Sequence, residues 1–393
     1  MLFRSLQVQL RSAAEMNGAA VAYAPRGPGG SPRIYLSAAV LESGISSEQI
    51  AWLLLKAAGH NIDARLNGDL DAAGDEGRSF AALLTGRTLT AAEQTLLGRE
   101  ATGGVVNING TAVAVETQPN QAPTLSATAS NAGFSEAQGL GTQAAAVAVF
   151  SKASVSVGGA SESWQTISAF SLRVGGLRDG ANERLWVDGL AISLGASGIG
   201  STSANGLSWT LSVSGDTATL SFSKAGGISS STLAGLINAI SYQNTNTDNP
   251  TAGDRTITIT SLSDSAGTGG GGTDTSTPNI TSTISVIAVN DAPQLGTLAG
   301  ITLTDTAAQD SFSASSGSLA ASDPEGGALS YGLEGALTSS VTLDGITYDR
   351  SKAGSYGTLY LNSGTGLYRF QPKSDWSLNA LSASGSDSFQ LSV

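Results

Sequence analysis

Acidic and amide side chains recur in this sequence where alternating apolar runs stop, usually beside Gly or Pro. Five short stretches show the pattern: FSEAQG, LRDGANERL, SLSDSAG, VNDAP and SDPEGG. Their oxygens are ligands for calcium, which takes six to eight oxygen atoms at about 2.3–2.6 Å. The sequence therefore predicts calcium sites at the ends of a sheet, with eight candidate ligands: Glu136, Asp179, Glu183, Asp264, Asn290, Asp291, Asp323 and Glu325.

The joint around Asp291 is the favoured site, because Asp323 and Glu325 follow it in an Asp-Pro-Glu-Gly turn. The stretch NDAP at Asn290 has an earlier counterpart, NQAP, in which Gln121 replaces the aspartate, so a site there should be weaker or empty. The alternative is that each Asp forms an Asx turn beside Gly, which needs no metal.

Residues for catalysis are scarce. The chain has no Cys and one histidine, His60, and Lys56 stands where a zinc helix would carry its second histidine. We expect His60 to be a capping or buried structural residue. Two carboxylate pairs, Asp75 with Glu76 and Asp179 with Glu183, could in principle cleave glycosides, but both lie in Gly-flanked turns. No enzyme activity is expected.

The composition of the chain disfavours some classes of binding partner and indicates the class of fold. A net charge of -12 disfavours nucleic acid and anionic lipid, both of which need basic patches. No apolar run is long enough to span a membrane, and the first residues lack the apolar core of a secretory signal. With 50 glycines and only 13% charged residues, the chain is expected to consist of short strands and turns.

Periodicity places the elements. Helical spacing predicts a helix capped by Ser46 or Ser47 and further short helices, one of them starting in a capping box at Thr90. Asn109-Gly110 between two alternating runs predicts a β-hairpin. Alternating strands follow to the end of the chain, interrupted by one helix in STLAGLINAISYQN and by a glycine-rich loop in GTGGGGTDTSTPN.

The expected fold is mainly β, with a small α+β domain followed by two antiparallel β-sandwiches in tandem. The expected segments are an N-terminal segment at 1–33, an α+β domain with a C-terminal hairpin at 34–117, a linker at 118–123, and sandwiches at 124–290 and 291–393. The last sandwich contains strands such as ITLTDT and DSFQLSV. The sequence stops within a predicted strand, so we expect either that it is cut from a longer protein or that its last strand is completed by something that follows it.

The third module resembles the VCBS or bacterial cadherin-like repeat. The matching residues are Asp323 to Gly326, the GTL…GLYRFQP hairpin from Gly357 to Pro372, and Asp387 to Phe389. The second module is similar to the cadherin-like domain that precedes such repeats in giant RTX-type surface proteins, through FSEAQG, LRDGANERLWVDG and AVNDAP. The resemblance implies calcium-stiffened sandwiches, repeated in tandem in bacterial adhesins, biofilm and surface-layer proteins.

The first module resembles a segment near the start of some of these giant proteins. It retains nine residues of that pattern, namely Gly59, His60, Asp63, Asn67, Gly74, Asp75, Glu76, Gly77 and Phe80, but has Lys56-Ala57 in place of a Glu-Glu pair.

Three functions stay open. The first is an extracellular structural or adhesive region of a bacterial surface protein, exported without an N-terminal signal, whose partners are its own further domains, copies of itself, or a cell-surface or matrix ligand. The second is a filament, sheath or surface-layer subunit that assembles when DSFQLSV adds to a neighbour's sheet. The third and most remote is a degenerate metallohydrolase around His60.

Overall fold

The computed structural model describes residues 6–42, 46–67, 76–89, 103–117, 120–158, 162, 165–268 and 272–393. The chain is mainly β, as predicted. It divides into two compact units. The N-terminal unit comprises 1–134, 144–246 and 251–287, and the C-terminal unit comprises 135–143, 247–250 and 288–393. None of the helices in the described ranges combines the length and apolar character needed to cross a membrane.

The first module is a five-stranded sheet with helices against it, in the strand order β1-β3-β2-β5-β4. Its strands are β1 (Gln7–Arg11), β2 (Val21–Ala24), β3 (Arg33–Ser37), β4 (Gly103–Ile108) and β5 (Thr111–Glu116), and its helices are α1 (Ala13–Met16), α2 (Ala38–Glu42), α3 (Ser47–Asn67) and α4 (Glu76–Thr85). Residue 33 is therefore no boundary, because β1 and β2 pair with β3 inside one sheet.

Local signals in this module work as expected. Ser46 caps α3: its Oγ accepts the backbone N–H of Gln49, whose side chain accepts the N–H of Ser46. The Asn109-Gly110 turn joins β4 to β5 with positive φ at both residues, 50° and 77°. The second capping box, at Thr90, lies outside the described residues.

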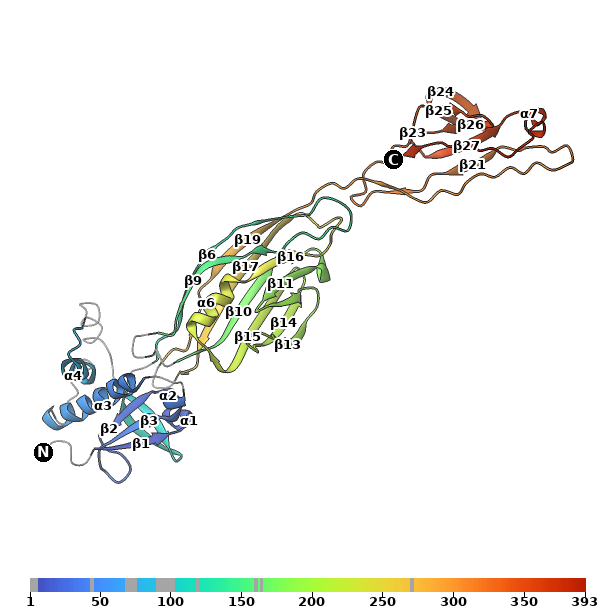
Figure 1. Cartoon of the computed structure of the whole chain (residues 1–393). Coiled ribbons are helices and arrows are strands. Elements are labelled where there is room, and N and C mark those ends of the chain that lie inside the picture. Colours follow the sequence, from blue (N-terminus) through green and yellow to red (C-terminus); the bar gives the residue numbers. More distant parts are fainter. Residues whose placement is uncertain are drawn as a thin grey trace. The chain divides into compact units, whose positions relative to one another are not determined.

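Both faces of the first sheet are covered. Val21, Tyr23, Ile34 and Leu36 pack against α2 and α3 (Figure 1). Residues at alternate positions of β2 and β3 form the opposite face, where they pack against α1 and against side chains of β4 and β5 in the same sheet. Helices α3 and α4 cross at two glycines of the resembling segment. A Cβ on Gly59 would lie 2.7 Å from the Cα of Gly77, and a Cβ on Gly77 would lie 2.3 Å from the carbonyl oxygen of Lys56.

We expect Gly77→Ala to destabilise the N-terminal unit by about 1–3 kcal/mol, because the added methyl overpacks this helix crossing. The matched control is Gly235→Ala in α6 (Ser230–Asn238), where nothing lies within 4 Å of the new Cβ. There the same change should be neutral or stabilising by up to ~1 kcal/mol, because alanine is the better helix former. Urea unfolding of both variants measures the difference. Equal effects at the two sites would refute the close-crossing explanation.

The second module is a sandwich of two antiparallel sheets, which run in the orders β13-β14-β15-β10-β17-β19-β7, with β18 beside β17, and β12-β11-β16-β8. The larger sheet contains β7 (Gly133–Ser135), β10 (Ile167–Gly175), β13 (Gly198–Ser201), β14 (Ser208–Ser214), β15 (Thr217–Ile228), β17 (Gly253–Asp264), β18 (Thr275–Ser276) and β19 (Ile280–Ile287). The smaller sheet contains β8 (Val147–Ala148), β11 (Glu183–Val187), β12 (Leu190–Ser193) and β16 (Ser241–Asn244). A separate ladder pairs β6 (Thr124–Ala129) with β9 (Phe150–Ser156).

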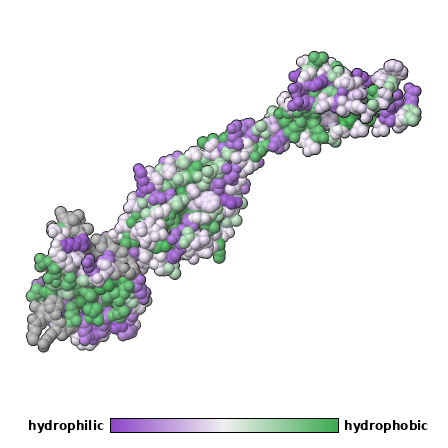
Figure 2. Space-filling model, in the orientation of Figure 1, coloured by the Kyte–Doolittle hydropathy of each residue, from purple (hydrophilic) through white to green (hydrophobic). Residues whose placement is uncertain are grey.

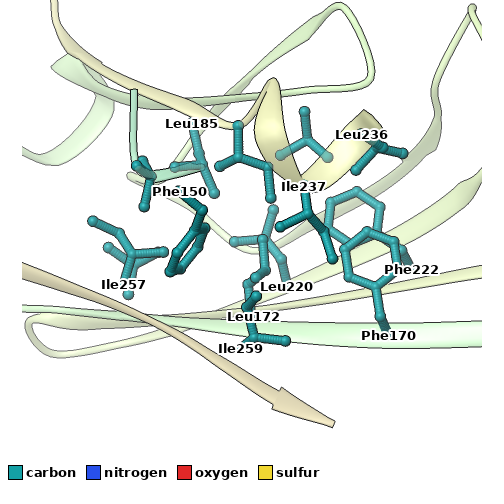
Figure 3. Close-up of a cluster of buried hydrophobic side chains, with 14 of the residues drawn as sticks. Phe150, Phe170, Leu172, Leu185, Leu220, Phe222, Leu236, Ile237, Ile257 and Ile259 are labelled. Carbon is teal, nitrogen blue, oxygen red and sulfur yellow. The ribbon is translucent and has the colours of Figure 1, made fainter. Parts of the chain in front are cut away.

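The core of this sandwich lies between its two sheets. Figure 3 shows Phe170, Leu172, Ile257 and Ile259 of the larger sheet facing Leu185 of the smaller one, with α6 over the same cluster. The helix predicted in STLAGLINAISYQN is α6. It buries Leu233, Leu236 and Ile237 and is capped by Ser229, whose side chain accepts the N–H of Thr232. Alternating strands and one amphipathic helix thus enclose one apolar core.

The C-terminal module has one five-stranded antiparallel sheet, β21-β27-β26-β25-β24, and two short ladders, β20-β22 and β23-β28. The elements are β20 (Gln294–Leu295), β21 (Ser315–Ser318), β22 (Ala321–Ser322), β23 (Gly332–Leu333), β24 (Leu337–Leu343), β25 (Ile346–Ala353), β26 (Gly357–Leu361), β27 (Leu367–Pro372), α7 (Asp375–Asn379) and β28 (Leu391–Ser392). Its core is small: Leu319, Tyr331, Leu333, Leu359, Leu361 and Phe370.

Two expectations for this module change. The stretch ITLTDT at 301–306 forms no strand, so that prediction is wrong. The stretch DSFQLSV is used within its own chain: β28 pairs with β23, and the Phe389 ring lies 6.1 Å from that of Phe370.

Candidate metal centre

Three carboxylates from distant parts of the sequence meet in the C-terminal unit. Glu136 directly follows β7, Asp291 follows β19 after a short coil, and Glu325 lies in the turn after β22. One oxygen from each side chain lies within 4.8 Å of the others. Two oxygens bound to one calcium ion at about 2.3–2.6 Å can be at most ~5 Å apart, so these three fit around a single ion.

Backbone groups orient this cluster. The Val289 N–H donates to Glu136 Oε2 at 2.7 Å, and the Gly139 N–H donates to Asp291 Oδ1 at 2.9 Å. Glu325 lies in a turn closed by the Gly326 N–H bonding the Asp323 carbonyl. The carboxylates of Glu136 and Asp291 are thereby fixed from outside the cluster, while Glu325 is placed by the backbone of its turn.

The remaining oxygens lack hydrogen-bond partners. They are Glu136 Oε1, Asp291 Oδ2 and both carboxylate oxygens of Glu325, although Glu136 and Asp291 are only 4% and 2% exposed. Burial raises the pKa of Glu136, and the charges of Asp291, Glu325 and Asp248 raise it further. Buried like charges of this kind are costly without a counter-ion, and a divalent cation held by the free oxygens would supply one. The cluster could hold a metal ion.

Two of the predicted ligands support the cluster without joining it. Asp323 Oδ1 accepts the Gly327 N–H at 3.0 Å, so its side chain braces the turn that bears Glu325. The side-chain N–H₂ of Asn290 donates a hydrogen bond to the Asp291 carbonyl at 2.8 Å. These contacts are the Asx-type interactions weighed as the alternative to metal binding.

Asp179 and Glu183 bind an arginine, and their prediction as metal ligands is corrected accordingly. The Arg255 guanidinium is fully buried and places Nε 3.0 Å from Glu183 Oε2 and Nη2 3.4 Å from Asp179 Oδ2. Glu183 also accepts the Tyr242 hydroxyl at 2.8 Å, and Arg255 Nη2 donates to the Thr251 carbonyl at 2.9 Å. Burial lowers the pKa of Arg255, but its hydrogen bonds and charge interaction with Glu183 raise it on balance.

The prediction of Asp264 as a metal ligand is also corrected, because a side-chain amide hydrogen-bonds its carboxylate. The side-chain N–H₂ of Asn120, in the NQAP stretch, lies 3.0 and 3.1 Å from the two Asp264 oxygens, and Asn120 Oδ1 accepts from Gln165 Nε2 at 2.8 Å. The next residue, Gln121, donates its N–H to Glu162 Oε1 at 2.9 Å. Hydrogen bonds therefore connect NQAP to the sandwich.

The buried Asp264 predicts an unusual dependence of stability on pH. Burial raises its pKa from 3.8 to about 6, so the folded state binds the proton more tightly than the unfolded chain. Stability contributed by this group should increase as pH falls from about 6 towards 4, by on the order of 2–3 kcal/mol at ~1.4 kcal/mol per pKa unit. Asp264→Asn should remove that slope in urea unfolding between pH 4.5 and 7.5. The exposed Asp216→Asn should keep it, and a slope unchanged by Asp264→Asn would contradict the assignment.

Sequence reasoning missed two contributors to these clusters. Asp248, in the loop after β16, accepts the Gly141 N–H at 2.5 Å, and its charge acts on Glu136. The stretch TDNP, an acidic residue followed closely by proline after a strand, resembles the VNDAP signal and could have revealed it. Arg255 lies in period-2 register with buried Ile257 and Ile259, which identifies an inward-facing cation.

His60 is a buried residue of α3, with Nδ1 3.1 Å from Glu116 Oε2. Among the described residues, no group of three or more potential ligands that could hold a metal includes it. Asp75, one of the carboxylates considered for glycoside cleavage, lies outside the described residues.

Comparison with known proteins gives no family: no family model matches the chain, and no curated protein matches it. The resemblance to cadherin-like and VCBS-type repeats therefore stays a prediction.

Proposed function

We propose that this chain is a calcium-binding, structural or adhesive part of a bacterial cell-surface protein, located outside the cell and without catalytic activity. The observation that carries the proposal is the cluster of Glu136, Asp291 and Glu325, with buried oxygens that have no hydrogen-bond partner. A structural ion there would tie together three segments that are far apart along the chain, as the Gly139–Asp291 hydrogen bond already does across 152 residues.

Calcium is the cation that suits these ligands best. All three donors are carboxylates, and the chain has no Cys and only one His, which disfavours zinc and other softer metals. Magnesium is a poorer match because it demands near-ideal octahedral geometry and keeps several waters. A calcium site completed by backbone oxygens and water would have the modest affinity of extracellular modules, ~10⁻⁴–10⁻³ M.

Thermal unfolding with millimolar calcium, with magnesium and with chelator tests the proposal. Because an ion bound only by the folded state stabilises it by RT ln(1 + [L]/Kd), calcium should raise the Tm of the C-terminal unit by several degrees. Magnesium should raise it less. Calcium should also slow proteolysis of residues 288–393. A Tm and a proteolysis rate that chelator leaves unchanged would refute the calcium proposal.

A further inference from the structure

A large apolar groove opens in the C-terminal module. Its volume is about 750 Å³, and its floor is the inner side of the five-stranded sheet and its edge, including Leu319, Leu359 and Phe370. Its two walls are the segments 298–305 and 381–387. An engineered apolar cavity of ~150 Å³ can stay empty of water in a folded protein. This groove is several times larger, and core residues of the module form part of its lining. A groove of this volume with an apolar floor favours a bound ligand or chain segment.

The walls of the groove favour an extended peptide. Neither wall forms a strand. Within 298–305 and 382–387 no backbone group makes a backbone–backbone hydrogen bond, although the Leu381 N–H donates to the Leu378 carbonyl. Unpaired N–H and C=O groups beside an apolar floor match what a β-strand needs, namely backbone partners and pockets for alternate side chains.

The charges around the groove indicate a basic occupant. Two carboxylates, Asp305 and Asp387, belong to the lining, and no Lys or Arg does. Asp387 is held by the backbone N–H groups of Ser355 and Tyr356, at 2.7 and 2.9 Å, which leaves its negative charge without a cation. A strand with alternating apolar residues and arginine at its ends would complement this lining.

Strand β1 of the same sequence has these properties. Within the described part of the chain it is an edge strand that pairs with β3 on one side only, and its Val8 and Leu10 are 51% and 55% exposed. The stretch RSLQVQLR, from Arg4 to Arg11, carries two arginines and no acidic residue, although the Arg11 guanidinium also contacts Glu15. In Figure 2, hydrophobic residues gather over the region where Figure 1 labels β1, β2 and β3.

We propose that the groove receives strand β1 of a second copy of this chain, so that copies join head to tail. The free edge of β1 pairs with the groove wall at 298–305, and Val8 and Leu10 face the apolar floor. Because the two surfaces differ, the contact does not close on itself and generates an open chain of subunits. This assembly goes beyond the structural role proposed above and does not depend on the metal centre.

Sedimentation velocity of the full chain from about 1 to 100 µM, with calcium and with chelator, tests the proposal. We expect concentration-dependent association in both conditions. The variant Val8→Asp/Leu10→Asp should weaken association at least tenfold, because it removes the apolar contacts and sets carboxylates against Asp305 and Asp387. The control Ile199→Asp, at an 82% exposed position of the edge strand β13, should associate like the native chain.

A labelled RSLQVQLR peptide locates the site independently. It should bind the Val8→Asp/Leu10→Asp chain, whose groove is intact, and an ESLQVQLE peptide should bind at least tenfold more weakly. A chain that stays monomeric at every concentration overturns the proposal, as does association unaffected by the β1 substitutions. Equal binding of the two peptides also overturns it. So does an apolar dye that binds in the groove and is not displaced by RSLQVQLR. Calcium-independent association combined with no calcium effect on Tm would refute the metal proposal alone.

Discussion

Replacing Arg255 with methionine is expected to destabilise the N-terminal unit by about 3–5 kcal/mol, the range for breaking a buried ion pair from one side. The side chains of Arg255 and Glu183 are 0% exposed, and that of Asp179 is 5% exposed. Methionine can fill much of the space but leaves two buried carboxylates without a cation. Backbone contacts are also affected. Arg255 donates to the carbonyls of Gly253 and Thr251, and it supports Asp179, which accepts the Thr251 N–H.

Urea unfolding monitored by tryptophan fluorescence measures this effect. Arg173→Met, at an exposed position of β10, is the matched control and should change stability by less than about 0.5 kcal/mol. Adding Glu183→Gln to Arg255→Met should recover part of the lost stability, because it removes one of the two buried carboxylate charges that have no cation. A loss below about 1 kcal/mol for Arg255→Met would show that the buried carboxylates do not depend on this cation.

The substitution Glu136→Gln should change stability in opposite directions with and without calcium. In chelator it removes a charge from a buried cluster, and because burial and neighbouring carboxylates raise the pKa of Glu136, the neutral amide should match or exceed the native Tm. In calcium it removes a charged ligand, so the ion should bind at least ~10-fold more weakly. At a calcium concentration of 100 Kd the native site gains ~2.7 kcal/mol, of which the variant should lose ~1.3 kcal/mol or more.

Glu334→Gln is the control for this experiment, because Glu334 is an exposed acidic residue of the same C-terminal unit. It makes the same change of charge and should leave the calcium-induced shift in Tm intact. Calorimetric titration gives the affinities directly. If Glu136→Gln lowers the Tm equally in calcium and in chelator, Glu136 has a packing role and does not bind the ion.

Local sequence signals predicted the elements that depend on neighbouring residues. Asn109-Gly110 specifies its turn because both residues tolerate positive φ, and Ser46 caps α3 through contacts three residues away. The alternation around Ile257 and Ile259 specifies which side of a strand is buried. In contrast, ITLTDT alternates equally well and forms no strand, because a strand also needs a partner edge, which local propensity does not specify.

The candidate site was predictable only in part, because its composition depends on contacts between distant residues. Acidic residues at strand ends pointed to Glu136, Asp291 and Glu325, which the structure brings together in a cluster that could hold a metal ion. The same signal also selected Asp179 and Glu183, whose partner Arg255 is 72 residues from Glu183 in the sequence. A carboxylate that binds arginine and one that is free for metal look alike until the sheet register is known.

A crystal structure of the chain grown with calcium, with anomalous diffraction recorded at long wavelength, tests the central claim most directly. We predict an anomalous peak between Glu136, Asp291 and Glu325, with carboxylate oxygens at about 2.3–2.6 Å from it. The absence of a peak at millimolar calcium, with hydrogen bonds or water satisfying the four free oxygens instead, would contradict the account.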